Sequence, residues 1–211
     1  MAMYFRIKRL TDIVCAIIGI VVFSPVILIA SLFIKSVSPE GSIFVDSKPR
    51  VGKDGKEFKM YKLRTMRPNA QKWLETQPEL YKRYQENGYK LDPDPRLLKG
   101  GKFIRKYSID EMPQFFNVLK GEMSVVGPRA YFKYELEEQE GRYPHTKDYI
   151  KQALTTKPGL TGPWQIGGRS NVNFEERIKM DSEYASRHSV LYDLIILLKT
   201  PYVVITGSGA V

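Results

Sequence analysis

The sequence predicts an α+β fold: a mainly helical unit with a small antiparallel sheet, carried on an N-terminal membrane segment. Three observations support this prediction. Residues 13–34 contain no charged side chain, and as a helix this run is long enough to cross the hydrocarbon core of a bilayer. Residues 42–66 carry strand and hairpin patterns. Much of the remaining sequence has the pattern of helices separated by turns.

The composition limits the classes of function. With 211 residues, of which 43% are hydrophobic, the chain can bury the core of one domain. The net charge of +10 indicates an anionic partner, which is nucleic acid, an anionic membrane surface or a phosphorylated substrate. The single Cys15 and the two histidines, His145 and His188, argue against disulfides and against a cysteine- or histidine-rich metal centre. A metal ion would instead have oxygen ligands, as magnesium does.

The membrane segment is interrupted at Ser24-Pro25. Pro25 has no N–H for the carbonyl of Val21, so we expect a sharp bend in which the Ser24 hydroxyl bonds a freed carbonyl. Basic residues flank the run on both sides, which places both ends in the cytoplasm by the positive-inside rule. A helix-break-helix that enters one leaflet and returns meets both demands. A kinked spanning helix is the alternative, and these residues alone do not decide between the two.

Residues 42–66 predict the antiparallel sheet. SIFV at 42–45 is a short strand, and KDGK at 53–56 is a hairpin turn signal. One face of the strand that follows carries alternating residues, Phe58, Met60, Lys62 and Arg64. Two cations at the end of an apolar face predict a strand that points into a binding site, although a solvated strand end gives the same pattern.

Helical patterns follow at 69–87, 131–153 and 173–188. Pro78 suits a first helical turn, and Gly88 suits a C-terminal cap. DPDPR at 92–96 predicts a rigid turn, and 157–165 predicts a loop. Residues 191–205 are apolar but too short and too charged to span a bilayer, so they predict a packing helix or a membrane-surface helix.

The adjacent carboxylates Asp110 and Glu111 allow two interpretations. Ser108 and Glu111 match a capping box, which would make both acids the ordinary start of a helix. Pro113 fits that register poorly, because its missing N–H would fall inside the helix. A helix that begins at Met112 places Pro113 at its first position and leaves both acids free to face a ligand.

Arginines on either side of the acids indicate phosphate chemistry. Arg105 lies upstream, and a Gly-Pro turn presents Arg129 downstream. Among these cations we expect the pKa of Asp110 to be lowered, so that it is ionised and can act as a nucleophile. Glu111 can hold a magnesium ion, and the arginines can bind phosphate oxygens. The set fits phosphoryl transfer, and it fits an acidic helix start with surface salt bridges equally well.

Motifs along nearly the whole chain point to one family. They are KRLTDIV, the run broken at Ser24-Pro25, RVGKDGKEFKMYKLRTM, DPRLLKGGKFIRKYSIDEMPQFFNVLKGEMSVVGPR, KPGLTGPWQ and GRS. In this order they resemble the bacterial monotopic phosphoglycosyl transferases, or polyprenyl-phosphate sugar-1-phosphate transferases. The last part, from FEERIKMDSEYASRHS to the GSGA ending, is similar to the longer hexose-1-phosphate transferases of polysaccharide pathways.

The resemblance implies an enzyme that moves sugar-1-phosphate from a UDP-sugar to undecaprenyl phosphate and releases UMP. It implies that Asp110 is the nucleophile, which forms a covalent phospho-sugar intermediate, and that Glu111 helps to hold Mg²⁺, alone or with Asp110. Arg105 and Arg129 would bind phosphate. Further substrate-binding positions that match family motifs are Lys62, Arg64, Asp94, Arg96, Pro128 and Gln165.

The resemblance also favours re-entry at Ser24-Pro25. It implies a membrane segment at 1–38 and a catalytic domain at 39–211 on the cytoplasmic face of the bacterial inner membrane, with 155–211 as an extension. The expected partners are a UDP-sugar, undecaprenyl phosphate, anionic membrane lipids and a second copy of the chain as a homodimer, but no nucleic acid. Because many long relatives carry an N-terminal transmembrane bundle, we expect a minimal or truncated form. A hexose such as galactose or glucose is implied by resemblance only.

The chain departs from the family at two positions. The usual Pro-Arg-Pro is Pro128-Arg129-Ala130 here, which predicts a looser turn, and Met112 replaces the usual leucine, which is a mild change.

Two other classes of function compete with the enzyme. A nucleic-acid or phospholipid-binding module fits the positive charge, but no base-reading motif supports it. A scaffold that has lost catalysis is disfavoured by the intact acids and arginines.

Overall fold

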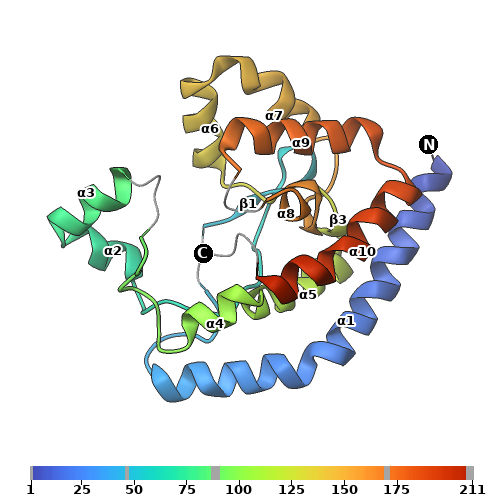
Figure 1. Cartoon of the computed structure of the whole chain (residues 1–211). Coiled ribbons are helices and arrows are strands. Elements are labelled where there is room, and N and C mark those ends of the chain that lie inside the picture. Colours follow the sequence, from blue (N-terminus) through green and yellow to red (C-terminus); the bar gives the residue numbers. More distant parts are fainter. Residues whose placement is uncertain (1, 46–47, 87–90, 169–171, 208–211) are drawn as a thin grey trace.

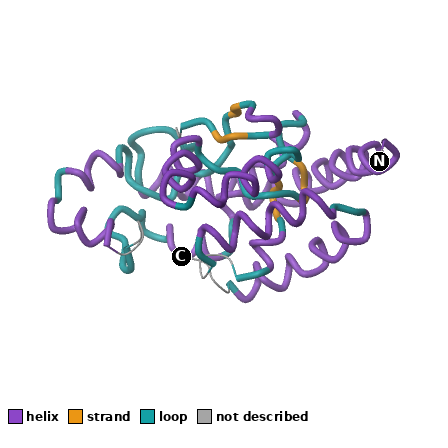
Figure 2. The backbone as a smooth tube through the Cα atoms, turned by 90° about the horizontal axis from the view of Figure 1, so that it is seen from above, coloured by secondary structure: helices purple, strands orange, loops and turns teal. Residues whose placement is uncertain are grey.

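One long helix, α1 (Ala2–Val37), runs along one side of the molecule in the computed structural model and turns beneath the other elements (Figure 1). The structure describes residues 2–45, 48–86, 91–168 and 172–207. The later elements are β1 (Arg50–Val51), β2 (Glu57–Phe58), α2 (Ala70–Glu75), α3 (Pro78–Glu86), α4 (Gly101–Lys106), the 3-10 turn η2 (Ile109–Gln114), α5 (Phe115–Lys120), β3 (Ser124–Val126), α6 (Lys133–Arg142), α7 (Lys147–Ala153), β4 (Gly159–Thr161), α8 (Pro163–Ile166), α9 (Phe174–Arg187) and α10 (Val190–Thr206). Seen from above, helices dominate and the short strands lie among them (Figure 2).

The segment Met3–Val37 is long and apolar enough to cross a membrane, judged by length and composition. Ser24 Oγ donates to the carbonyl of Val21 at 3.0 Å. Pro25 has no N–H to donate to this carbonyl, so the predicted hydrogen bond from the Ser24 hydroxyl is confirmed. Helix α1 bends near its middle (Figure 1), as expected of a helix with an internal proline. The helix continues across Pro25, so the predicted break is a bend, and re-entry stays a prediction.

The inner face of α1 packs closely on α5. A Cβ atom on Gly19 would lie 2.6 Å from the Phe115 ring, so only glycine allows this approach. Phe115 also stacks on Phe23, with ring centroids 6.0 Å apart. From the N-terminal half of α1, Arg9 donates to the carbonyls of Val118 and Leu119, which satisfies groups left free at the end of α5.

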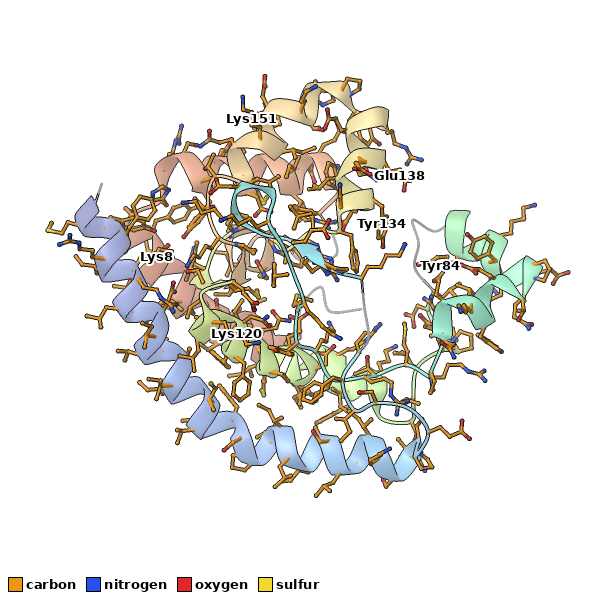
Figure 3. All side chains as sticks on the ribbon, turned by 180° about the vertical axis from the view of Figure 1, so that it is seen from behind. Lys8, Tyr84, Lys120, Tyr134, Glu138 and Lys151 are labelled. Carbon is orange, nitrogen blue, oxygen red and sulfur yellow. The ribbon has the colours of Figure 1, made fainter. Side chains whose placement is uncertain are left out.

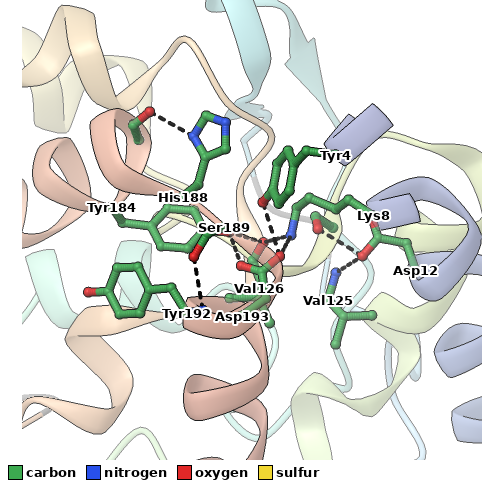
Figure 4. A network of polar contacts seen from close by, with 12 residues as sticks. Tyr4, Lys8, Asp12, Val125, Val126, Tyr184, His188, Ser189, Tyr192 and Asp193 are labelled. Carbon is green, nitrogen blue, oxygen red and sulfur yellow. Dashed lines mark hydrogen bonds and ion pairs between the residues drawn. The ribbon is translucent and has the colours of Figure 1, made fainter. Parts of the chain in front are cut away.

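A polar network joins the start of α1 to α10 (Figure 4). Lys8 Nζ lies 2.8 Å from Asp193 Oδ2, and the hydroxyls of Tyr4 and Tyr184 donate to the same carboxylate. One turn further along α1, the buried Asp12 accepts hydrogen bonds from β3. The polar residues at the start of α1 are therefore satisfied by the domain itself.

The hairpin prediction is confirmed, because β1 and β2 pair in antiparallel fashion around the KDGK turn. The SIFV strand is reduced to one bridge between Phe44 and Leu63. A second sheet was not predicted: β3 pairs in parallel with β4, and β4 lies inside the stretch 157–165 that was predicted to be a loop. Glycines permit this contact, since a Cβ on Gly162 would lie 2.0 Å from the carbonyl oxygen of Gly127.

The predicted helical stretches are confirmed as α2 with α3, α6 with α7, α9 and α10. Gly88, residues 169–170 of the GRS motif and residues 208–210 of the GSGA ending lie outside the described residues. Both α1 and α10 expose large apolar side chains, as a membrane-contacting surface would. On α10 these are Val190, Leu191, Leu194, Ile195, Leu198, Tyr202 and Ile205.

Candidate active site

The two acids lie in the 3-10 turn η2, directly before α5. The capping-box interpretation is wrong: Ser108 has a left-handed backbone with φ of 54° and makes no capping hydrogen bond with its side chain. A start at Met112 is also wrong, because the α-helix begins at Phe115. Asp110 and Glu111 nevertheless precede the α-helix, as a ligand-facing role requires.

Lys62 is the direct partner of both acids. Its Nζ donates to Glu111 Oε1 at 2.9 Å and lies 3.0 Å from Asp110 Oδ2. The N–H of Leu63 donates to the carbonyl oxygen of Asp110 at 2.9 Å, which fixes the two segments against each other. The side chain of Asp110 is 2% exposed and that of Glu111 is 39% exposed. One acid is thus enclosed, while its neighbour reaches solvent.

Burial sets the electrostatics of this pair. Desolvation raises the pKa of Asp110, and the nearby Lys62 and Arg105 only partly oppose it. The predicted lowering of this pKa is wrong, because burial outweighs the cations. Burial also favours neutral Lys62, but Glu111 and Asp110 together raise the pKa of Lys62. The lysine is therefore cationic at neutral pH, and it holds two acids that would otherwise repel each other.

Arg105, in the last turn of α4, stands beside the acids. Its Nε donates to Thr65 Oγ1 at 2.9 Å, and its charge acts on both Asp110 and Asp94. Asp94 and Arg96 form a buried ion pair of 2.7 Å. Although burial opposes it, hydrogen bonds from Arg96 hold the pKa of Asp94 below its usual range. The predicted substrate residues Asp94 and Arg96 therefore pair with each other at the edge of the site.

Arg64 does not contact the acids as Lys62 does in the described structure. Its guanidinium donates to Ser38 Oγ and to the carbonyls of Ser38, Glu40 and Ser42, at 2.6–2.9 Å. These acceptors belong to the segment that leaves α1. The described donors of Arg64 thus hold the segment that follows α1, and its substrate-binding role stays a prediction.

Arg129 is held at a second cluster. Its backbone N–H donates to Asp181 Oδ2 at 3.0 Å, and its guanidinium lies over the Trp164 ring at 4.7 Å. The Tyr131 hydroxyl donates to the same carboxylate oxygen at 2.8 Å. Burial raises the pKa of Asp181 to about 7. Gln165 adjoins Trp164, and its Oε1 is buried without a partner among the described residues.

The turn at 128–130 is held without the usual second proline. Gly159 donates its N–H to Pro128 O at 2.8 Å, and Arg50 donates to Ala130 O at 3.0 Å. Val51 donates to Tyr131 O at 2.8 Å. The looseness expected from Ala130 is offset by these contacts from two neighbouring segments.

Arg50 links the two clusters. Burial, and then the charge of Arg129, lower the pKa of Arg50 to about 10, while Glu111 opposes this shift. Arg50 therefore lies within electrostatic reach of both a predicted phosphate-binding arginine and a predicted metal ligand. The sequence presented Arg50 only as a flanking cation. Asp181 and Trp164 were missed as well, because nothing local in the sequence places them beside Arg129.

The two acids are the oxygen ligands that this site offers to a metal ion. No three acidic, histidine or cysteine side chains converge within the described part of the chain. Magnesium is commonly held by one or two carboxylates and completed by substrate phosphates. Asp110 Oδ2 is buried and accepts no well-aligned hydrogen bond in the described structure, and Glu111 lies beside it. The two acids fit a partial magnesium site that a diphosphate would complete.

Comparison with known proteins identifies the family of the chain. Residues 3–207 match the family model described as bacterial sugar transferase. Over 97% of its length the chain is 42% identical to the undecaprenyl-phosphate galactose phosphotransferase of Salmonella typhimurium (strain LT2). Over 93% it is 35% identical to the UDP-glucose:undecaprenyl-phosphate glucose-1-phosphate transferase of Escherichia coli (strain K12). Over 96% it is 37% identical to the exopolysaccharide production protein ExoY of Rhizobium meliloti (strain 1021).

The chain covers different shares of these relatives. It spans 41% of the Salmonella protein and 39% of the Escherichia protein, but 87% of the Rhizobium protein. The chain therefore corresponds to less than half of the two longer relatives and to most of the shorter one.

Proposed function

Because the chain belongs to the bacterial sugar transferase family, we propose that it transfers a hexose-1-phosphate from a UDP-sugar to undecaprenyl phosphate and releases UMP. The observation that carries this proposal is the enclosed Asp110, held by Lys62 beside Glu111 and accompanied by Arg105. The name of the Escherichia relative specifies a UDP-sugar donor and an undecaprenyl phosphate acceptor, and the name of the Salmonella relative specifies the same acceptor. The proposed setting is exopolysaccharide synthesis, as in the name of the Rhizobium protein.

The reaction has two steps. A carboxylate oxygen of Asp110 attacks the phosphorus that carries the sugar, and the bond from that phosphorus to the bridging oxygen breaks. UMP leaves with the bridging oxygen and the bonding electron pair. An oxygen of the lipid phosphate then attacks the same phosphorus, the aspartyl–phosphate bond breaks and the carboxylate is restored. Two steps allow a soluble donor and a lipid acceptor to use one site in turn.

The charged side chains around Asp110 position the acids and bind the phosphates of the substrates. Lys62 holds both acids in place, while Arg105 and Arg129 bind phosphate oxygens, which guanidinium groups do in bidentate fashion. Glu111, with Asp110, would hold Mg²⁺, which supplies charge neutralisation for the diphosphate. Arg50 adds positive charge between the two clusters.

The covalent step is tested with the donor alone. The chain mixed with UDP-galactose or UDP-glucose should release UMP without any lipid phosphate, and a peptide containing Asp110 should gain the mass of the hexose phosphate. Asp110→Asn should abolish both signals, whereas Asp148→Asn on α7 should keep them. UMP release that depends strictly on lipid phosphate would instead favour direct attack, with Asp110 as general base. A panel of UDP-sugars in the same assay identifies the sugar.

The membrane arrangement is a second part of the proposal. Helix α1 would enter the cytoplasmic leaflet and return at the bend beside Pro25, with anionic lipids attracting the basic surface at about 1 kcal/mol per cation. In a Cys15→Ala background, Met3→Cys and Glu40→Cys should both react with an impermeant thiol reagent from the cytoplasmic side only. Labelling of the two cysteines from opposite sides of the membrane would establish a spanning helix.

A further inference from the structure

A groove opens beside the acids, on the face of the molecule where Lys120 lies (Figure 3). Its volume is about 580 Å³, which is within the range of small-molecule sites. None of the arginines 50, 105 and 129 lines it. The residues that matter for its chemistry are Phe44, Lys59, Tyr61, Pro113, Phe116 and Lys120.

The groove is lined by sequence neighbours of the acids and of Lys62, although none of these three side chains lines it. Tyr61 immediately precedes Lys62, and Pro113 is the second residue after Glu111. The opposite wall is tied to the same place, because the N–H of Val45 donates to the carbonyl of Lys62 at 2.8 Å. A ligand in the groove would therefore lie next to the segments that carry Lys62 and the two acids.

The lining combines aromatic rings with cations. Phe44 is 44% exposed and Phe116 is 46% exposed. The rings of Phe44 and Tyr61 lie 6.5 Å apart, edge to face. Lys120 contacts the Tyr61 hydroxyl, and this contact raises the pKa of Lys120, which is thus cationic at neutral pH. Exposed aromatic surface beside lysines suits a molecule that has an apolar chain and an anionic head.

The groove is also continuous with the apolar helix. On one side it is bounded by α5, whose Phe115 packs against α1 while the next residue, Phe116, lines the groove. On the other side it is bounded by the segment at 42–45, which leaves the end of α1. Both walls are therefore anchored on the helix that carries the exposed apolar surface.

We propose that this groove binds the polyprenyl phosphate acceptor, with its first isoprene units against Phe44, Tyr61 and Phe116. Lys59 and Lys120 attract its phosphate and guide it toward Asp110. The proposal rests on the proposed function and deepens it. It separates the acceptor, in the groove, from the nucleotide diphosphate at the arginines. A chain that rises from the membrane beside α1 would contact these rings while its phosphate approaches the acids.

The kinetic test compares the two substrates. Phe116→Ser should raise the KM for undecaprenyl phosphate by about tenfold, because a half-buried phenyl ring is lost from the contact. Lys120→Glu should raise the same KM. Both variants should keep the KM for the UDP-sugar and the rate of UMP release without acceptor within about twofold of the unaltered chain, which a fold defect would not do. Tyr149→Ser and Lys151→Glu are the matched controls on α7, and Lys151 lies far from Lys120 (Figure 3).

A binding test works without turnover. Asp110→Asn protein in detergent micelles is titrated with radiolabelled undecaprenyl phosphate, with and without Phe116→Ser. About tenfold weaker binding supports the groove. Unchanged binding, an equal rise of both KM values, or equal competition by phosphatidylglycerol overturns it. If the unaltered chain transfers nothing from any UDP-sugar, the proposed function fails in the transfer assay, and this binding result still decides whether the groove takes the lipid.

Discussion

Replacing Arg64 with alanine tests whether this arginine holds the fold or binds substrate. The side chain is 7% exposed and makes four hydrogen bonds to the segment after α1. At about 1 kcal/mol of net stability each, with some of the freed carbonyls able to reach water, the loss is about 3–4 kcal/mol. For a chain of this size that corresponds to a fall in Tm of about 6–15 °C. Thermal unfolding in detergent, followed by intrinsic fluorescence, measures it.

Two further variants sharpen the experiment. Arg67→Ala is the control, because the exposed Arg67 packs over the Trp73 ring at 4.7 Å and its loss should cost less than about 1 kcal/mol. Arg64→Lys keeps the charge but loses the planar guanidinium group. The Tm of this variant should therefore also lie below that of the unaltered chain, while its KM for the UDP-sugar stays unchanged. An unchanged Tm for Arg64→Ala, together with a tenfold rise in that KM, would refute the structural interpretation of Arg64.

Three other experiments, with four variants, probe the site and the packing. Lys62→Met should lower kcat/KM by about 100-fold, with UMP release as the readout, because the acids lose the cation that offsets their repulsion. The pKa of Asp181 is raised to about 7 from an ordinary 3.8. The stability from its bound proton is therefore complete below about pH 3.8 and lost as pH rises to about 7, and Asp181→Asn should flatten the fall in Tm between about pH 5 and pH 7.5. Gly19→Ala should cost about 1–3 kcal/mol by pressing on the Phe115 ring, whereas Gly141→Ala on α6, with nothing within 4 Å of the added Cβ, should gain up to about 1 kcal/mol; equal Tm values for the two glycine variants would contradict the packing argument.

Local patterns were sufficient for part of this fold. The KDGK turn and the helical stretches are confirmed, because their signals lie within a few neighbouring residues. The pairing of β3 with β4 could not be predicted in this way. Each strand has three residues, too few to show a period, and the contact depends on glycines more than thirty positions apart in the sequence, such as Gly127 and Gly162.

The site shows the same division. Two cations were predicted to share one strand face. In the structure Lys62 contacts the acids, whereas Arg64 bonds the segment that follows α1. The alternation of side chains along a strand cannot predict which partner each cation has, because the partners come from distant segments. The direction of the pKa shift at Asp110 was wrong for a related reason. Charges can be counted in a sequence, whereas burial depends on the completed fold.

The ion pair between Lys8 and Asp193 joins the first and last of the described helices, 185 positions apart. During synthesis α1 is made long before α10, so Lys8 at first lacks this carboxylate. The contact closes only when α10 has left the ribosome, and such distant contacts form late. This contact therefore forms only in the complete chain, and a chain expressed without α1 would carry Asp193 without its cation.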